Sequence, residues 1–306
     1  MTNAQATDKH PGELTDVPGW FPPLDQMLFT WFLEGQQKQG IKGDLLELGV
    51  YMGKSAILLG QHLQNGEKFT VCDLFEGDAP DGANQAESAK SYASLTRQTF
   101  ERNYLSFHDD LPTVIAAPSS VVPEKVAPAS CRFIHVDASH LYEHVHGDIG
   151  AAHDILVPEG IVVLDDFRSE HTPGVSVAAW EAVLNRGLRP ICLSTQKLYG
   201  TWGDPEPLQE ELLDMLRQRS DVGLSVQSAA GHRLVRARSR GMKPPPFPAS
   251  RHYVAPPAAP KAPAEVTESR AARPARPAPS RARRLAKDLL PPLVTRAVRR
   301  ARANRS

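Results

Sequence analysis

The stretch that decides the fold of this chain is Asp44-Leu-Leu-Glu-Leu-Gly-Val-Tyr-Met-Gly-Lys-Ser55. It begins as an apolar run that carries the acid Glu47, breaks into a turn with glycines at positions 49 and 53, and continues as a helical pattern. In an open α/β sheet, ligands bind beyond the carboxyl ends of the strands, and glycine lets a ligand approach the backbone of the first strand-to-helix turn. The stretch therefore predicts a strand, a ligand-binding turn and a helix of an α/β domain.

The glycine spacing indicates which ligand this turn accepts. A dinucleotide-binding turn has the pattern G-x-G-x-x-G, whereas this chain has Tyr51 at the middle position and no third glycine. A pyrophosphate is therefore disfavoured. The next apolar run, residues 68–75, places Asp73 near its end, where a carboxylate can accept hydrogen bonds from ribose hydroxyls. The glycine pair alone is also compatible with ordinary helix-to-strand packing, but the turn and the acid together predict a nucleoside site.

Acids also stand at the ends of two further predicted strands. Residues 131–140 and 159–167 are each a short β-rich run that ends in carboxylates, and residues 142–156 between them predict a helix. Since the carboxyl ends of parallel strands meet at one rim, the acids should converge there and need a cation; oxygen ligands suit Mg²⁺. Zinc is not expected, because no Cys or His pair stands beside them at zinc-site spacing. The expected ligands are Asp137, Asp165 and Asp166.

In these motifs the chain resembles the class I S-adenosylmethionine-dependent methyltransferases, and among them the divalent-metal O-methyltransferases. The branch that contains the macrolide and aminocoumarin sugar O-methyltransferases is the more similar one, over roughly residues 24–203. The likeness is carried, in the family's order, by Glu47-Leu-Gly49 to Gly53, Asp73-Leu-Phe-Glu-Gly77, His135-Val-Asp-x-x-His-x-Tyr142, Asp148, Pro158-x-Gly160 and Leu164-Asp-Asp-Phe167.

The resemblance implies a fold and a set of site residues. The fold is α/β and Rossmann-like, with a mostly parallel seven-stranded sheet and helices on both faces. S-adenosylmethionine and Mg²⁺ are the implied cofactors, with Asp137, Asp165 and Asp166 as metal ligands. The implied cofactor-binding residues are Glu47, Gly49, Tyr51, Gly53, Ser55, Asp73, Leu74, Ser119 and Asp137.

At the positions where its relatives carry the general base, this chain has different residue types. The sugar enzymes have an acid two positions after the first metal ligand, where this chain has Ser139. His140 stands where catechol-type relatives have a basic lysine, and imidazole titrates in the useful range, so we expect His140 to be the base. Other histidines crowd the same region and stay open as alternatives: His135, His144, His146, His153 and His171.

The function implied by these features is Mg²⁺-assisted methyl transfer from S-adenosylmethionine to a hydroxyl group. The resemblance suggests a small-molecule acceptor, a sugar on a glycolipid or on a glycosylated natural product. Two alternatives remain at this point: a non-catalytic adaptor that keeps the cofactor site, and a hydroxylase built on the same fold. An adaptor has no reason to keep mutually repelling carboxylates, and a hydroxylase would need an iron site, which an all-carboxylate set disfavours.

Charge divides the chain into a body and a tail. Residues 243–306 hold 15 Lys or Arg and 3 Asp or Glu, a net charge of +12, and the other 20 Lys or Arg and 32 Asp or Glu give −12. We expect an arm at 1–23, the methyltransferase domain at 24–240, a disordered Pro/Ala/Arg-rich linker at 241–280 and a basic amphipathic tail at 281–306.

The tail and the cysteines bear on partners and location. A basic amphipathic helix favours an anionic membrane surface, and nucleic acid is disfavoured because no aromatic residue lies among the arginines to stack on bases. A tail that touches the acidic body or only aids solubility is the alternative. The three cysteines show no disulfide spacing and residues 1–19 no signal pattern, so we expect a cytoplasmic protein, peripheral on the inner membrane surface. A homo-oligomer is compatible with the sequence, as in related sugar enzymes.

Overall fold

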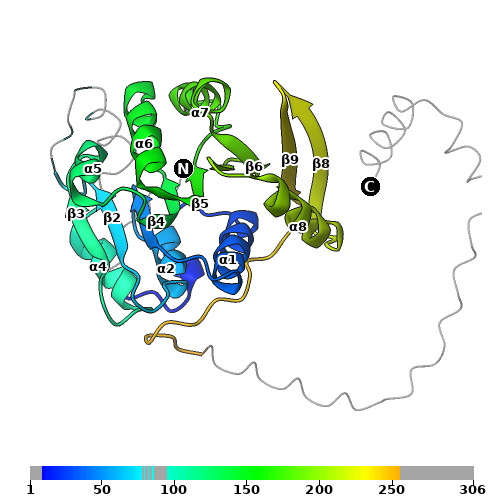
Figure 1. Ribbon diagram of the computed structural model, residues 1–306. Helices are drawn as coiled ribbons and strands as arrows, with labels where there is room; N and C mark the ends of the chain where they lie inside the picture. Colours follow the sequence, from blue (N-terminus) through cyan, green and yellow to red (C-terminus); the bar gives the residue numbers. More distant parts are fainter. Residues whose placement is uncertain (1–8, 78, 80–81, 83–84, 86–94, 256–306) are drawn as a thin grey trace, which may run out of the picture. The chain divides into compact units, whose positions relative to one another are not determined.

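A mostly parallel sheet forms the centre of the computed structural model, which describes residues 9–77, 79, 82, 85 and 95–255 and has nine strands within them (Figure 1). The strand order is β3-β2-β1-β4-β5-β7-β6-β9-β8. The first five strands are mutually parallel, and β7 runs antiparallel to both of its neighbours, β5 and β6. The strands are β1 (Asp44–Leu48), β2 (Phe69–Asp73), β3 (Thr113–Ala116), β4 (Cys131–Val136), β5 (Leu156–Leu164), β6 (Arg189–Leu193), β7 (Leu198–Thr201), β8 (Val222–Ala229) and β9 (His232–Ser239).

Helices cover both faces of the sheet, as the sequence predicts (Figure 1). One hydrophobic cluster joins the sheet to α1, α2, α4 and α8, and a second joins its other face to α5, α6 and α7. The helices are α1 (Pro23–Lys38), α2 (Lys54–Gln61), α4 (Arg97–Leu105), α5 (Val122–Lys125), α6 (Tyr142–Ile155), α7 (Pro173–Asn185) and α8 (Glu206–Arg217), with short 3-10 turns at Leu14–Asp16 and Ser119–Val121.

The prediction of a seven-stranded sheet is wrong, because the hairpin of β8 and β9 joins the sheet and brings it to nine strands. The sequence predicts a hairpin around Gly231, and the structure pairs its second strand with β6 through Leu193 and Arg236. Because β9 is an interior strand, both of its faces are covered: Val235 packs in one hydrophobic cluster and Leu234 in the other. The hairpin therefore extends the sheet by two strands.

Aromatic packing holds α1 against the carboxyl ends of the central strands. The Phe29 ring of α1 lies 5.1 Å from the rings of both Phe133 and His135 on β4, edge to face, and 6.0 Å from the ring of Tyr199 on β7. All four side chains are at most 1% exposed. This packing closes the interior directly behind the strand ends where the acids were predicted.

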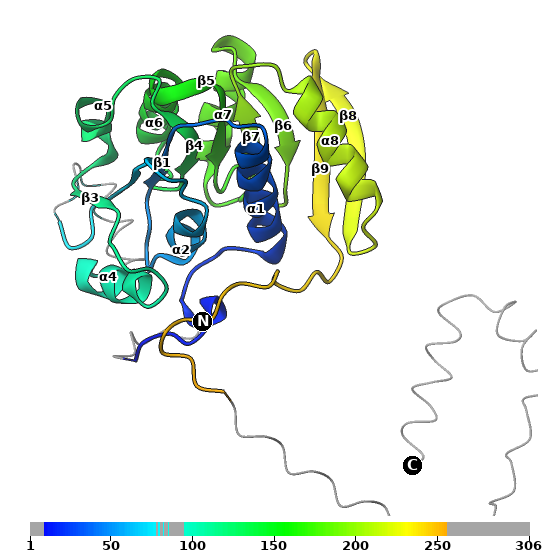
Figure 2. The ribbon, with the colours of Figure 1, turned by 60° about the horizontal axis from the view of Figure 1, so that its bottom comes forward.

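The segments on either side of the domain pack against each other. Figure 2 shows the N-terminal segment beside the segment that follows β9. Ser250 donates from its backbone N–H to the Gly12 carbonyl at 2.9 Å and from its hydroxyl to the Pro11 carbonyl at 2.6 Å, and Arg251 pairs with Asp109 at 2.9 Å. Residues 241–255, the first part of the predicted linker, belong to the compact unit that ends at Ala255. The rest of that linker, the basic tail and the first eight residues of the arm lie outside the described residues.

None of the helices in the part of the chain that the structure describes is both long enough and apolar enough to cross a membrane.

Candidate active site

The glycine turn between β1 and α2 lies directly against the backbone that follows β4. Gly49 has φ +79°, and a Cβ atom added there would meet the carbonyl oxygen of Asp137 at 2.0 Å. Gly53, with φ +92°, starts α2, and Tyr51 between them also has a positive φ of 46°. The close approach explains why position 49 has no side chain, and it brings the predicted cofactor turn and the first predicted metal ligand together.

Asp73 at the end of β2 holds the turn in this shape. One carboxylate oxygen, Oδ2, accepts hydrogen bonds from the backbone N–H groups of Val50 at 2.8 Å and Tyr51 at 3.1 Å. The other, Oδ1, accepts one from the N–H of Phe75 at 2.9 Å. Burial raises the pKa of Asp73, and the three N–H groups counter that rise. A carboxylate has about four acceptor positions, so one remains for a hydroxyl ligand.

A cavity of about 830 Å³ extends from this turn to the ends of β4 and β5. Its volume suits a nucleoside-sized ligand together with part of a second molecule. Of the predicted site residues, Gly53 and Glu47 do not line it. Those that do are Gly49, Tyr51, Ser55, Asp73, Leu74, Ser119, Asp137, His140, Asp165 and Asp166.

Glu47 is buried behind the turn, and its carboxylate contacts a residue of the protein interior. Its side chain is fully buried, and the Oε1 atom lies 2.7 Å from Nδ1 of His135. Hydrogen bonds to Asp165 and Glu47 raise the pKa of His135 to about 9, against the lowering effects of burial and of Lys197. Glu47 thus supports β4 from β1, and its predicted contact with the cofactor is not made through the cavity wall.

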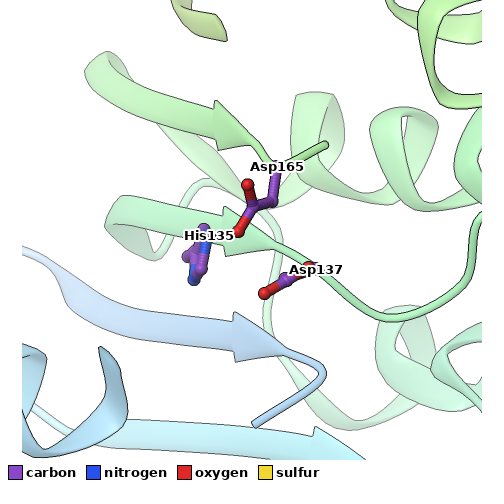
Figure 3. Close-up of side chains that lie close together, drawn as sticks. All are labelled: His135, Asp137 and Asp165. Atoms are coloured by element: carbon purple, nitrogen blue, oxygen red, sulfur yellow. Dashed lines mark ion pairs between the residues drawn. The ribbon is translucent and has the colours of Figure 1, made fainter. Parts of the chain in front are cut away.

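Asp165 at the end of β5 points into the interior, toward His135 and Asp137 (Figure 3). Its Oδ2 atom forms a short ion pair with the ammonium group of Lys197 and lies 3.6 Å from Nε2 of His135, and its Oδ1 atom accepts the backbone N–H of Asp166 at 2.7 Å. Burial is the largest single effect and raises the pKa of Asp165, but the charges and hydrogen bonds of Lys197 and His135 together outweigh it and the pKa is lowered. Burial and the neighbouring Asp165 carboxylate raise the pKa of Asp137 well above its ordinary value.

Asp166 turns the other way and forms a pair with His140. Its backbone has a positive φ of 50°, and its Oδ2 atom lies 3.1 Å from Nε2 of His140, while Oδ1 accepts the Ser169 hydroxyl at 2.7 Å. Burial is the largest single effect and raises the pKa of Asp166, but the interactions with His140 and the hydrogen bond from Ser169 together lower the pKa. Both side chains are partly exposed, at 21% for His140 and 23% for Asp166. The adjacent acids of the Asp165-Asp166 pair therefore face different partners.

The predicted three-carboxylate metal site is not assembled as a unit. Among the described residues, the groups whose ligand atoms lie within 4.8 Å of one another are His135, Asp137 and Asp165, and separately Asp137, His140 and Asp166. Each group includes a histidine nitrogen, whereas Mg²⁺ prefers an all-oxygen set. In addition, the Oδ2 atom of Asp165 already pairs with the positive charge of Lys197. The residues present do not fit a magnesium ion held by Asp137, Asp165 and Asp166 together.

Ser119, predicted to contact the cofactor, lies on the cavity wall beside a buried acid of α6. Its hydroxyl donates to Asp148, which is 3% exposed and whose Oδ2 atom has no hydrogen-bond partner among the described residues. Burial is the main cause that raises the pKa of Asp148 to about 6.

This pKa predicts a pH-dependent stability for the ligand-free protein. Because the pKa of Asp148 is higher in the folded than in the unfolded chain, its ionisation opposes folding as the pH rises from 3.8 through about 6. Asp148→Asn should raise the free energy of unfolding by about 3 kcal/mol at about pH 8 and change it little at about pH 4. Urea unfolding at the two pH values measures the difference. An equal effect at both would show that charge is not the cause.

The ion pair of Lys197 with Asp165 and the burial of His135 in the interior were not predicted from the sequence. The register that pairs Leu198 on β7 with Leu164 on β5 places Lys197 beside Asp165. The sequence signal was a lone lysine before the short apolar run 198–201. A lysine at the start of a strand is usually solvated. The register between β5 and β7 is set by tertiary pairing and could not be derived from this signal.

Comparisons with known proteins find one matching family model and a set of similar solved structures. Residues 46–167 match a family model described as a methyltransferase domain. No curated protein matches the chain. Similar solved structures include the O-methyltransferase NovP, at 16% identity over 59% of this chain and 81% of that chain with a TM-score of 0.47. Another is CalS11, a TDP-rhamnose 3'-O-methyltransferase of calicheamicin biosynthesis, at 16% identity over 60% and 82% with a TM-score of 0.40.

A third is TomG, an O-methyltransferase from Streptomyces achromogenes in complex with S-adenosylmethionine, at 16% identity over 71% and 78% with a TM-score of 0.32. At these identities and scores, the similar structures decide nothing about the function of this chain. The matched region holds the glycine turn, Asp73, Asp137, His140 and the Asp165-Asp166 pair. The match assigns residues 46–167, and with them these motifs, to a methyltransferase domain.

Proposed function

We propose that this methyltransferase acts on oxygen, and that its acceptor is a hydroxyl group of a sugar on a glycolipid or glycosylated natural product. The observation that carries the proposal is the pair of His140 and Asp166, with Nε2 and Oδ2 3.1 Å apart, in the same cavity as the turn that Asp73 holds. Methyl transfer to a hydroxyl requires removal of its proton, which an oriented imidazole performs. The sugar class comes from the resemblance of the motifs.

The cofactor fits the turn for a structural reason. A side chain at position 49 would collide with the Asp137 backbone, so the turn is bare on the side that borders the cavity, and Asp73 keeps an acceptor position beside it. When bound, S-adenosylmethionine supplies an electrophilic methyl group on a sulfonium. The residues that would hold it are Gly49, Tyr51, Asp73, Leu74 and Ser119.

In the proposed reaction, His140 takes the proton of the acceptor hydroxyl. Its Nε2 atom lies 3.1 Å from Oδ2 of Asp166, which places the imidazole ring beside a carboxylate. Asp166 fixes the orientation of the ring and stabilises the imidazolium that forms, and Ser169 fixes Asp166 in turn. The remaining task is to exclude water and to hold the hydroxyl in line with the methyl group. No step of this proposal requires the magnesium ion that the sequence suggested.

The first test is a calorimetric titration of the full chain with S-adenosylmethionine, run once with Mg²⁺ and once with a chelator. The proposal predicts binding of one equivalent in both conditions. Absence of binding in both would remove the methyl-transfer proposal and favour an adaptor or a hydroxylase. Binding that the chelator abolishes would instead restore a metal to the site.

Asp73→Asn tests the turn within the same experiment. The asparagine amide nitrogen is a donor, so one of the two oxygens that now accept backbone N–H groups would be replaced by a group facing another donor. We expect the affinity for S-adenosylmethionine to fall by about tenfold or more, since a buried unpaired donor is costly. Asp110→Asn, at an exposed position, is the matched control and should bind as the unaltered protein does. Equal affinities of the two variants would contradict the role of Asp73.

A further inference from the structure

The charged group that the methyl-transfer proposal leaves unused is the ammonium of Lys197. Its side chain is 1% exposed, and the Asp165 carboxylate with which it pairs is 7% exposed. A buried lysine without a specific partner would be expensive, because taking a charge out of water costs several kcal/mol in real proteins. The position of this ammonium is therefore tied to the acids at the strand ends.

Several interactions hold Lys197 in place. Its Nζ atom forms the short ion pair with Asp165 and lies 5.8 Å from the centre of the Phe21 ring, in cation–π range. Ser194 accepts the backbone N–H of Lys197 through its side chain at 3.0 Å, and its own N–H donates to the Lys197 carbonyl at 2.9 Å. The tight turn before β7 thus fixes the backbone from which the side chain reaches inward.

The ammonium and a divalent ion would compete for the same carboxylate. A metal ligand must offer an oxygen lone pair about 2.1–2.6 Å from the ion. In Asp165, Oδ2 is taken by Lys197 and Oδ1 by the backbone N–H of Asp166. An ion bound at Oδ2 would lie beside the fixed positive charge of the ammonium, and the two cations would repel each other at short range.

We propose that Lys197 takes the place of a divalent cation at Asp165, so that this methyltransferase neutralises its buried acids with a side chain of its own. Asp165 is then a positioning residue: it orders Asp166 through the backbone N–H, and Asp166 in turn orients His140. The inference rests on the proposed function in one respect: it takes the carboxyl ends of β4 and β5 as the site of the reaction. Its test measures metal binding, which can succeed or fail independently of methyl transfer.

The experiment is a titration of the full chain with Mn²⁺, followed by electron paramagnetic resonance of the free ion, on four proteins. They are the unaltered chain, Lys197→Met, Lys197→Met with Asp165→Asn, and Lys54→Met. Removal of the ammonium should free Asp165 and raise the affinity for Mn²⁺ on the order of a hundredfold, since a unit charge at about 4 Å is worth several kcal/mol near a protein surface. The double variant should lose that gain, because it lacks the freed carboxylate.

Lys54→Met is the matched control. Lys54 also lines the cavity, but its ammonium donates to the Gly19 carbonyl at 3.3 Å. Its replacement should leave the Mn²⁺ affinity unchanged. A gain of the same size in this variant would show that any cavity lysine repels the ion, and would overturn the specific role of Lys197.

A further variant keeps the proposal testable if Lys197→Met does not fold. In the otherwise unaltered chain, Asp165→Asn should leave Mn²⁺ binding as it is, because Asp165 is not a ligand while Lys197 is present. If the unaltered chain binds Mn²⁺ and Asp165→Asn abolishes that binding, Asp165 is a metal ligand and the proposal is wrong. It is equally wrong if Lys197→Met folds and gains no affinity.

Discussion

Replacing Gly49 with alanine is expected to lower the free energy of unfolding by about 4 kcal/mol or more and to abolish binding of S-adenosylmethionine. The added Cβ atom would lie 2.0 Å from the Asp137 carbonyl oxygen and 2.5 Å from its carbon, and both belong to backbone that cannot rotate away. The positive φ of 79° adds strain of its own. Either the turn or the end of β4 must move, and both line the cavity. Urea unfolding and calorimetry measure the two effects.

Gly40→Ala separates the collision from the backbone strain. Gly40 has a similar φ of +72°, but an added Cβ atom there meets nothing within 4 Å. Its replacement should cost about 1–2 kcal/mol, the strain of a left-handed alanine, and leave cofactor binding intact. If the two variants lose equal stability, the turn does not press on the Asp137 backbone, and the geometry of the site described above is wrong.

The second large effect is expected at His140. Its replacement by alanine should reduce the rate of methyl transfer by about 10²- to 10⁴-fold, the usual contribution of a positioned general base, while the affinity for S-adenosylmethionine changes little. The measurement is the formation of S-adenosylhomocysteine with an acceptor found by screening sugars and glycosides. Asp166→Asn should lose part of the same factor, because it removes the acceptor that orients the ring.

The double replacement at 140 and 166 distinguishes a cooperating pair from two separate roles. Residues that act as a unit are not additive, so the double variant should be about as slow as His140→Ala alone. His153→Ala is the control: this histidine is exposed, lies 2.9 Å from Asp154 and does not line the cavity. Full activity of His140→Ala would assign the base to another residue, with His144 and His171 on the cavity wall as the next to test.

The sequence was most informative where function requires a backbone geometry. Gly49 and Asp73 were predicted to share one site because a glycine turn and an acid at the next strand end serve one ligand. In the structure, Asp73 accepts hydrogen bonds from the two residues that follow Gly49 in the turn. Strand ends of a parallel sheet meet at one rim by construction, so the convergence of Asp137 and Asp166 could also be foreseen. These features depend on topology more than on side-chain packing.

The parts that could not be foreseen depend on which way a side chain turns. Nothing in the Asp165-Asp166 pair shows that the first acid faces the interior and the second the cavity; the positive φ of Asp166 decides it. The partner of Asp165 is Lys197, brought alongside by the antiparallel register of β5 and β7. The extra pair of strands was missed for the same reason, since a hairpin's sequence does not say which sheet edge it joins.

The meeting of the two ends of the described unit has a consequence for protein engineering. The rings of His10 and His252 stack with their centres 4.0 Å apart, and Ser250 donates hydrogen bonds to the two backbone carbonyls that follow His10. A short glycine-rich peptide could therefore join the ends of the unit without distorting either segment. New termini could then be opened in an exposed turn such as that at Gly231, far along the chain from the glycine turn and the acids. The fold is thus suited to circular permutation.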